Sequence, residues 1–358
     1  MRSSGWTREW TRREVLAALA ATACVRNATA QAPAGPQRLD VHHHMFTPDA
    51  VNTFQANFDN GVAGPLRLDW TPEQSLEAMD QAGVDTALLS CNIPFGDDPA
   101  AMRDQVIRVA REMNDHGARQ VSDHAGRFGL LAALPLPNVD ASLREIEYVF
   151  DTLNADGVGL LTSYGNRWLG DASFQPVFDE LNRRRAVVYS HPITAPCCHN
   201  LLPDTGSQVL EWNTDTSRAI WNMINDGDAA SPRVSTATRC PNVTFIWSHA
   251  GGTLLGLIQR FLGADSSPES LAQTPEPNSR LYHLRRFYYD TANTYNPIEM
   301  TALKSLVGAS QIVFGSDFPF VSPLDGVQGL QRSGLSAAEL QGVFAGNALR
   351  IFPRWKKA

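Results

Sequence analysis

The chain has 358 residues, of which 43% are hydrophobic and 19% are charged, so it can bury a large core and does not look disordered. Its formal net charge is −7, and only three of its 30 basic residues are lysines. An acidic chain is poorly suited to bind nucleic acid, and five scattered cysteines do not make a disulfide framework. The composition excludes a collagen, a coiled coil, a multi-span membrane protein and a small disulfide-stapled domain.

The first 30 residues have the pattern of an export signal. Basic residues precede an apolar run at 15–25, and Ala28-Thr-Ala30 offers small residues for cleavage. This run would cover about half of a ~30 Å hydrocarbon core, so it cannot span a membrane. The run Thr11-Arg-Arg-Glu-Val-Leu16 resembles the twin-arginine signal, which carries folded proteins. We expect an exported, periplasmic protein, the alternative being a disordered basic tail.

The rest of the chain alternates short apolar runs with helical patterns. The predicted strands are 39–42, 86–90, 128–133, 157–161, 186–190, 243–247, 287–290 and 311–314. The predicted helices are 72–82, 99–116, 141–153, 174–184, 217–226 and 253–262. Thr71, Asp140 and Asp171 are expected to cap helices, and 192–217 and 264–279 to be loop insertions. Eight such units favour an α/β fold, a single-domain (β/α)₈ barrel over residues 38–354, with a doubly wound open sheet as the alternative.

Five residues with metal-binding or acid–base side chains fall where predicted strands end. His42 and His44 end the first strand, His191 and His249 follow the fifth and sixth, and Asp317 follows the eighth. Because the active sites of such barrels lie at the carboxyl ends of the strands, these five side chains should meet at one mouth. Side chains alternate along a strand, so His42 and His44 should share a face, while the histidine between them points away.

The residue types at this mouth suit one divalent metal ion. His42, His44, His191 and Asp317 would supply three nitrogens and one oxygen, a set that favours zinc and also accepts manganese, iron or cobalt. His249 would then be an uncoordinated acid–base residue, because histidine titrates near neutral pH. Asp317 is expected to take part in catalysis as well as in metal binding. The alternative is that each of these residues is an ordinary buried polar group.

Four motifs around these residues resemble those of the amidohydrolase superfamily: Asp40-Val-His-His-His44-Met-Phe, Tyr189-Ser-His191-Pro, Trp247-Ser-His249-Ala-Gly-Gly and Phe314-Gly-Ser-Asp317-Phe-Pro. The match is to its amidohydrolase-related branch, which includes aminocarboxymuconate semialdehyde decarboxylase and metal-dependent aromatic acid decarboxylases. It runs from about Leu39 to Phe352. The segment 161–171 and the pair Cys197-Cys198 look most like proteins of the 6-methylsalicylate decarboxylase type.

This resemblance implies a metal-dependent decarboxylase of a hydroxylated aromatic or related unsaturated carboxylic acid such as 6-methylsalicylate. It assigns metal binding to the four residues named above and proton transfer to His249. It also assigns Arg260 to the substrate carboxylate, in some members across a subunit boundary, which implies a homodimer. Members with two metal ions bridge them with a carboxylated lysine after the fourth strand. No lysine precedes Lys304 in this chain, so we expect a single ion.

Several other residues near the predicted mouth are candidates for supporting roles. Tyr164 and Trp168 follow the fourth strand and are expected to wall an aromatic substrate. Asp290 ends the seventh strand and is a candidate partner of a metal ligand. Cys197 and Cys198 are soft metal ligands, a redox pair or buried thiols that shape the pocket.

The site residues alone do not fix the reaction. The same histidines and aspartate would serve a hydrolase that acts on a lactone, ester or amide. They would also serve a metal-binding protein without catalytic activity. The preference for a decarboxylase therefore rests on the resemblance. The acidic composition argues against nucleic acid, and the small carboxylic acid substrate remains the expected partner.

Overall fold

The computed structural model describes residues 36–52, 69–90, 102–199, 201–227 and 230–357. The expected export signal at 1–30 lies outside these residues, as does the beginning of the second predicted helix at 99–101. Residues Gln37–Ala358 form one compact unit. Within the described ranges, no helix combines the length and apolar character needed to cross a bilayer.

Eight parallel strands form the central sheet, in the order β1-β2-β3-β4-β7-β8-β9-β10. They are Leu39–His44 (β1), Thr86–Ser90 (β2), Phe128–Ala133 (β3), Gly157–Leu161 (β4), Val187–His191 (β7), Thr244–Trp247 (β8), Tyr288–Asp290 (β9) and Ile312–Val313 (β10). The sheet closes because the amide of Val41 donates to Phe314 O, and the amide of His44 donates to Phe318 O. The predicted (β/α)₈ barrel is confirmed, and every predicted strand is present.

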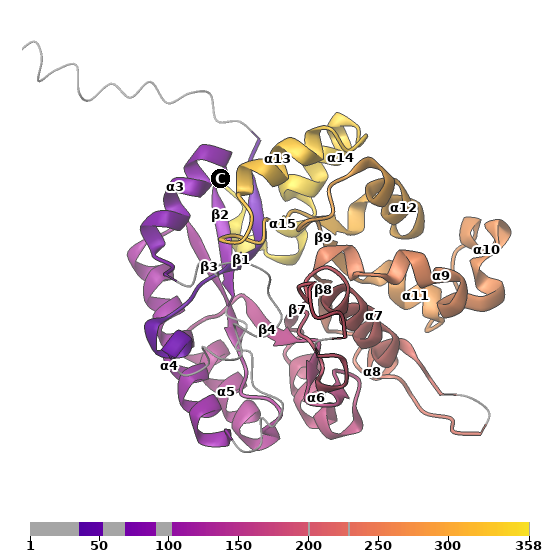
Figure 1. Ribbon diagram of the computed structural model, residues 1–358, viewed down its shortest axis with the longest axis horizontal. Helices are drawn as coiled ribbons and strands as arrows, with labels where there is room; N and C mark the ends of the chain where they lie inside the picture. The colour runs from indigo at the N-terminus through magenta and orange to yellow at the C-terminus, as the bar shows by residue number, and fades with distance from the viewer. Residues whose placement is uncertain (1–35, 53–68, 91–101, 200, 228–229, 358) are drawn as a thin grey trace, which may run out of the picture. The chain divides into compact units, whose positions relative to one another are not determined.

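Helices surround these strands, as Figure 1 shows. The longer ones are α3 (Pro72–Ala82), α4 (Arg103–Asp123), α5 (Val139–Asp151), α6 (Gln175–Arg183), α7 (Glu211–Ile224), α9 (Leu254–Leu262), α12 (Pro297–Val307) and α13 (Pro323–Gln331). The shorter ones are α8 (Thr236–Arg239), α10 (Pro268–Ala272), α11 (Arg280–Arg286), α14 (Ala337–Gln341) and α15 (Ala348–Ile351). A small hairpin, β5 (Ser163–Tyr164) and β6 (Arg167–Trp168), follows β4.

Two of the three residues predicted to cap helices accept a hydrogen bond from a backbone amide in the first turn. Thr71 caps α3 in a complete capping box, with Pro72 in the first turn. Asp171 accepts from the amide of Ser173 at the 3₁₀ turn that leads into α6. The prediction for Asp140 was wrong, because α5 follows Asn138 and Asp140 lies inside its first turn.

The two predicted insertions contain more helix than expected. Helix α7 begins at Glu211, inside the stretch predicted as loop up to residue 217. Its first turns carry Asp215, Thr216 and Ser217, which are buried although they are polar, so the sequence lacks the apolar periodicity of a helix there. The second stretch, 264–279, contains α10 and most of a preceding 3₁₀ turn.

The interior of the barrel is apolar at the end where the strands begin. Side chains from β1, β2, β3, β7, β8 and β10 pack there with Ala348 and Phe352, which close this end: Leu39, Val41, Leu88, Leu131, Val187, Tyr189, Ile246 and Val313. Such layers of side chains make the barrel a packed core rather than a pore. Polar side chains are consequently concentrated at the opposite end, where the strands finish.

Candidate metal centre

Strand β1 brings two histidines to the carboxyl end of the barrel. Its register against β2 shifts between Asp40 and His43, which marks a β-bulge in this strand. A bulge inserts a residue and re-aims the side chains around it. His42 and His44 face the centre, with their Nε2 atoms 3.1 Å apart. His43 lies on the other side, stacked on Phe318, as the alternation predicted.

Asp40 holds this bulge in place, a role that the sequence analysis did not assign. Its carboxylate is fully buried and accepts from the amides of His42 and Ser316, both at 3.0 Å. It also accepts from the Ser316 hydroxyl and lies 3.0 Å from His43 Nδ1. Asp40 thereby ties the first strand to the segment that carries Asp317. The sequence feature that could have indicated this role is the position of Asp40 at the start of the first histidine motif.

The five expected residues do converge. Asp317 Oδ1 lies 3.1 Å from His42 Nε2 and 3.0 Å from His44 Nε2. The His191 ring centroid lies 5.2 Å from that of His42 and 4.9 Å from that of His44. Ligand atoms of His42, His191, His249 and Asp317 lie within 4.8 Å of one another, and all four residues are buried. One small volume at the carboxyl ends of β1, β7, β8 and β10 therefore collects all five groups.

The outer atoms of four of these side chains are occupied by partners outside the cluster. Nδ1 of His42 lies 2.7 Å from Asp290 Oδ2, Nδ1 of His191 lies 2.8 Å from Pro192 O, and Nδ1 of His249 lies 3.0 Å from Ala292 O. Asp317 Oδ2 accepts from Asn293 Nδ2 at 2.8 Å. Outer hydrogen bonds of this kind fix the tautomer and ring orientation of histidines that bind metals. They leave the Nε2 atoms and Asp317 Oδ1 directed inward.

These inward atoms fit a single divalent metal ion. Two donors that share an ion at bond lengths of about 2.1 Å lie about 3.0 to 3.4 Å apart, for angles between a right angle and the tetrahedral angle. The measured separations of 3.0 and 3.1 Å fall in that range. The donors of His42, His44 and Asp317 thus have the spacing that one shared ion requires, and His191 offers a further nitrogen within 4.8 Å of those of His42 and Asp317.

The pKa shifts of His44, His191 and Asp317 match this arrangement, whereas the raised pKa of His42 favours its charged form, so His42 would have to release a proton to bind an ion. Burial opposes charge on His42, but Asp290 and Asp317 outweigh it and raise its pKa to about 10. Burial lowers the pKa of His44, and burial together with neighbouring histidines lowers the pKa of His191 well below its usual value. Burial also opposes charge on Asp317, but His42 holds the pKa of this carboxyl well below its usual range. Neutral imidazoles and a carboxylate anion are the forms that bind metals.

Asp290 connects two parts of the centre. Beyond its contact with His42, its Oδ1 accepts from the amides of His249 at 2.8 Å and of Ala292 at 3.0 Å. Gly315 provides the room for this pair, because a Cβ there would lie 2.8 Å from His42 Cβ and 3.0 Å from Asp290 Cγ. The contact between Asp290 and His42 therefore supports the expectation that Asp290 is the partner of a metal ligand.

Two of the five residues have left-handed backbones. His249 has φ 51° and Asp317 has φ 70°, conformations that are costly for residues other than glycine. The amide of His249 is held by Asp290, and the amide of Asp317 donates to His42 O at 2.9 Å. Gly252, with φ 66°, completes the turn after His249, where a Cβ would lie 2.0 Å from Asn213 O. Strain concentrated at a set of polar groups is typical of functional sites.

The residues predicted to contact substrate are less closely gathered. Tyr164 is buried, with its hydroxyl accepting from the amide of Leu161 and its ring against Phe174. Trp168 donates from Nε1 to Asp215 Oδ1 at 2.7 Å. Arg260 is exposed on α9, and within the described ranges it has no hydrogen bond or ion pair. Their roles toward substrate stay predictions.

Other aromatic residues, which the sequence analysis did not propose as substrate contacts, lie against the cluster. The Trp212 ring on α7 meets His191 edge-on at 5.8 Å, and Phe320 meets His44 at 5.3 Å. Phe46 stacks on His44 at 6.0 Å, and Phe320 keeps 40% of its surface exposed. Phe320 follows Asp317 by only three residues, and this proximity could have indicated its position beside the cluster. Aromatic faces so placed suit a flat substrate.

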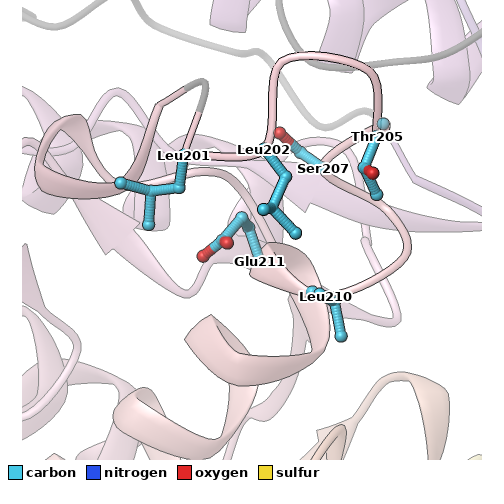
Figure 2. Close-up of a pocket in the computed structure, with 7 residues that line it drawn as sticks. Leu201, Leu202, Thr205, Ser207, Leu210 and Glu211 are labelled. Carbon is cyan, nitrogen blue, oxygen red and sulfur yellow. The ribbon is translucent and has the colours of Figure 1, made fainter.

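A pocket lies on the segment between β7 and α7. Figure 2 shows its lining, in which Leu201 and Leu202 lie around the carboxylate of Glu211. None of the five clustered residues lines it. This pocket is therefore distinct from the candidate metal centre.

The chain matches the amidohydrolase family model over residues 39–354. A decarboxylase of Aspergillus niger, yanB, is 32% identical over 335 residues, covering 89% of this chain and 88% of the relative. The 6-methylsalicylic acid decarboxylase of Penicillium expansum is 32% identical over 332 residues, covering 89% and 97%. Among solved structures, a dihydroxybenzoic acid decarboxylase of Polaromonas sp. with bound manganese and an inhibitor has a TM-score of 0.72, 19% identity and coverage of 90% and 98%.

A (β/α)₈ barrel with a buried histidine–aspartate cluster at the carboxyl ends of its strands is the architecture of a metal-dependent enzyme. The chain belongs to the amidohydrolase family.

Proposed function

We propose that this protein is a metal-dependent, non-oxidative decarboxylase of hydroxylated aromatic carboxylic acids, with 6-methylsalicylate as the first substrate to test. The observation that carries the proposal is the set of inward-directed Nε2 atoms and Asp317 Oδ1, held by outer hydrogen bonds at 2.7 to 3.0 Å. The names of relatives that share about a third of their residues with this chain support the choice of reaction.

His42, His44, His191 and Asp317 would hold the ion, which we propose to be zinc. When bound, a divalent ion supplies a Lewis acid that fixes a carboxylate and a neighbouring hydroxyl oxygen of the substrate. Manganese is the competing ion, since a structurally similar decarboxylase contains it. Metal analysis of the purified protein distinguishes the two, followed by reconstitution of stripped protein with each ion.

We propose that His249 moves the proton that the reaction needs. Loss of CO₂ from an aromatic acid requires a proton on the ring carbon that bears the carboxylate. Because Nδ1 of His249 is held by Ala292 O, its Nε2 is the nitrogen that faces the other ligand atoms and exchanges a proton. Asp290 fixes the backbone of His249 and the ring of His42, so one carboxylate sets the relative positions of the proton donor and a ligand.

The direct test is CO₂ release by the holoenzyme. 6-Methylsalicylate, other salicylate-type acids and muconate-type acids would be offered to protein of known metal content, with chelated protein as the control. We expect CO₂ and 3-methylphenol from 6-methylsalicylate, loss of turnover on chelation and recovery on adding metal. Metal-loaded protein that releases no CO₂ from any of these acids would contradict the proposal. Turnover of a lactone, ester or amide panel would then identify the hydrolase alternative.

A second experiment separates ligands from the proton carrier. His44, His191 and His249 would be replaced by asparagine one at a time, and the bound metal per chain would be measured. We expect His191→Asn and His44→Asn to lose metal, whereas His249→Asn keeps it. If His249→Asn loses the metal and His44→Asn retains it, the two residues exchange the roles proposed here.

We also propose that the protein works as a homodimer in which Arg260 binds the substrate carboxylate of the neighbouring subunit. The exposure of Arg260 and the half-buried apolar side chains of Leu255, Leu257 and Ile258 on α9 support this. Co-expression of His249→Asn with Arg260→Ala should restore activity through mixed dimers. A monomer in solution, or no restored activity from verified mixed dimers, would contradict it.

The N-terminal segment supports a proposal about location. Residues 1–30 would direct the folded protein through the twin-arginine route into the periplasm. Replacing Arg12 and Arg13 by lysine should retain the protein in the cytoplasm of a host with that route. Equal periplasmic recovery of both forms would contradict this proposal.

A further inference from the structure

The segment between β7 and α7 contains two adjacent cysteines for which the proposed reaction has no use. Cys197 and Cys198 lie in a 3₁₀ turn, Pro196–Cys198, six and seven residues after His191. Their sulfur atoms are 2.7 Å apart, a contact that approaches the covalent S–S length of about 2.04 Å. Cys197 is exposed and Cys198 is buried, so the pair presents one sulfur to solvent and one to the protein.

This turn is connected to the candidate metal centre. The Thr194 hydroxyl accepts from Trp212 Nε1 at 3.0 Å, and the Trp212 ring packs against His191. The turn itself begins at Ala195, whose carbonyl accepts from the amide of Cys198 at 2.9 Å. The cysteine pair therefore lies three residues beyond the residue that anchors Trp212.

We propose that Cys197 and Cys198 form a reversible vicinal disulfide by exchange with small disulfides such as oxidised glutathione. The exposed Cys197 thiolate attacks one glutathione sulfur, forming a mixed disulfide and releasing one glutathione thiolate. The Cys198 sulfur then attacks Cys197 and releases the second glutathione. The protein loses two electrons and two protons, and one glutathione disulfide becomes two glutathione thiols, so the exchange is balanced.

The order of attack follows from the surroundings of the two thiols. Burial raises the pKa of the Cys198 thiol to about 11, so this residue reacts poorly with reagents from solution. Its neighbour at 2.7 Å is already in reach, so attack within the pair needs no diffusion. Cys197 is consequently the entry point, and Cys198 is the resolving thiol.

Covalent geometry makes the resulting bond easy to reduce. Adjacent residues joined by a trans peptide have Cα atoms about 3.8 Å apart, whereas disulfides normally span about 4.4 to 6.8 Å. A ring closed over one peptide bond is therefore strained, and strained disulfides have more oxidising potentials than structural ones. The pair thus forms a labile modification site rather than a structural crosslink.

The test uses the full chain equilibrated in buffers of graded reduced-to-oxidised glutathione ratio, then acid-quenched, unfolded, alkylated and digested with trypsin. The peptide 186–218 contains both cysteines and no other. We expect it to lose both alkylation sites together, with a mass lower by two hydrogens than the dithiol form, and to regain both after dithiothreitol. Cys240, a single buried thiol, serves as the internal reference and should stay alkylatable.

Single variants test the order of attack. Cys198→Ser should accumulate glutathione on Cys197, because no resolving thiol is present. Cys197→Ser should leave Cys198 largely unmodified in the folded protein. The proposal is overturned if both wild-type thiols remain alkylatable in the most oxidising buffer. It is also overturned if the peptide carries two glutathiones or a crosslink to another cysteine peptide.

Discussion

Each end of the barrel contains an aspartate whose side chain is buried and accepts three hydrogen bonds or more, and the two aspartates have different roles. Asp290, where β9 ends, lies between His42 and His249. Asp156, just before β4, accepts from the amide of Leu130, from Trp355 Nε1 at 2.7 Å and from Arg354. The first carboxylate orients the groups that we propose to bind metal and move protons, whereas the second fastens the C-terminal segment to the barrel. Burial of charge alone therefore does not identify a site; the partners of the charge do.

The largest effect is expected at the proton carrier. His249→Asn should lower the rate of decarboxylation by about 10²- to 10⁴-fold, because general acid–base catalysis contributes on that scale. Steady-state kinetics on metal-loaded protein measures it. The matched control is His124→Asn, at the C-terminus of α4, which should leave the rate unchanged. A His249→Asn variant that decarboxylates as fast as the wild type would show that His249 is not the proton carrier.

The next effect distinguishes the two aspartates. Asp290→Asn should weaken metal affinity or activity by about 10- to 100-fold, as expected for the outer partner of a metal-binding histidine. The side-chain NH₂ group of the new asparagine would face a group that is itself a hydrogen-bond donor. The donors around this position are His42 Nδ1 and the backbone amides of His249 and Ala292. Asp156→Asn is the control, because it should lower stability and leave metal affinity unchanged. If Asp290→Asn and Asp156→Asn lowered the metal affinity equally, the proposed difference between the two ends of the barrel would be wrong.

A change at the closed end should affect stability alone. Phe352→Ala should cost about 3 to 5 kcal/mol, since this side chain is 3% exposed and fills the interior beside Leu39 and Val41. Phe352→Leu should cost less than about 1.5 kcal/mol, because it leaves a smaller void. Urea unfolding measures both, and kcat at low temperature should match the wild type. A loss of kcat in the folded Phe352→Ala variant would show that the ends are coupled.

A smaller effect concerns a histidine outside both ends. Burial lowers the pKa of His283 to about 4, and Arg286 adds to this, against Asp226. In the folded protein the His283 ring is neutral, so its contribution to the free energy of unfolding is fully present above pH 6.5. This contribution is lost as the pH falls from 6.5 to 4, where the ring of the unfolded chain takes up a proton before that of the folded protein. The stability of the wild type relative to His283→Gln should therefore fall by up to about 3 kcal/mol between pH 7 and 4. Urea titrations at several pH values measure the difference, and a constant difference would contradict it.

The strands and the five clustered residues could be predicted from sequence because each depends on local information. Runs buried on both faces have a continuous apolar pattern, and the polar residues that interrupt it at strand ends are visible directly. The β-bulge at Asp40–His43 could not be predicted, since it is defined by register against another strand.

Residues whose roles depend on distant partners were also beyond the sequence. Asp40 acts through Ser316, which is 276 positions away. The start of α7 was missed because Asp215 is a buried carboxylate whose partners, Ser163 and Trp168, lie in another part of the chain. The contact of the Tyr164 ring with Phe174 also depends on the hairpin after β4, and the predicted role of Tyr164 toward substrate stays a prediction.

The bonds from Asp40 to Ser316 have a consequence for how the protein is made. A ribosome completes the first strand and its histidines long before it reaches the segment 314–318, which both closes the barrel and supplies Asp317. A nascent chain therefore lacks the complete set of proposed ligands until the segment 314–318 has been synthesised. We therefore expect loading of the ion to follow synthesis of this segment, and removal of residues 314–318 to abolish metal capture and barrel closure together.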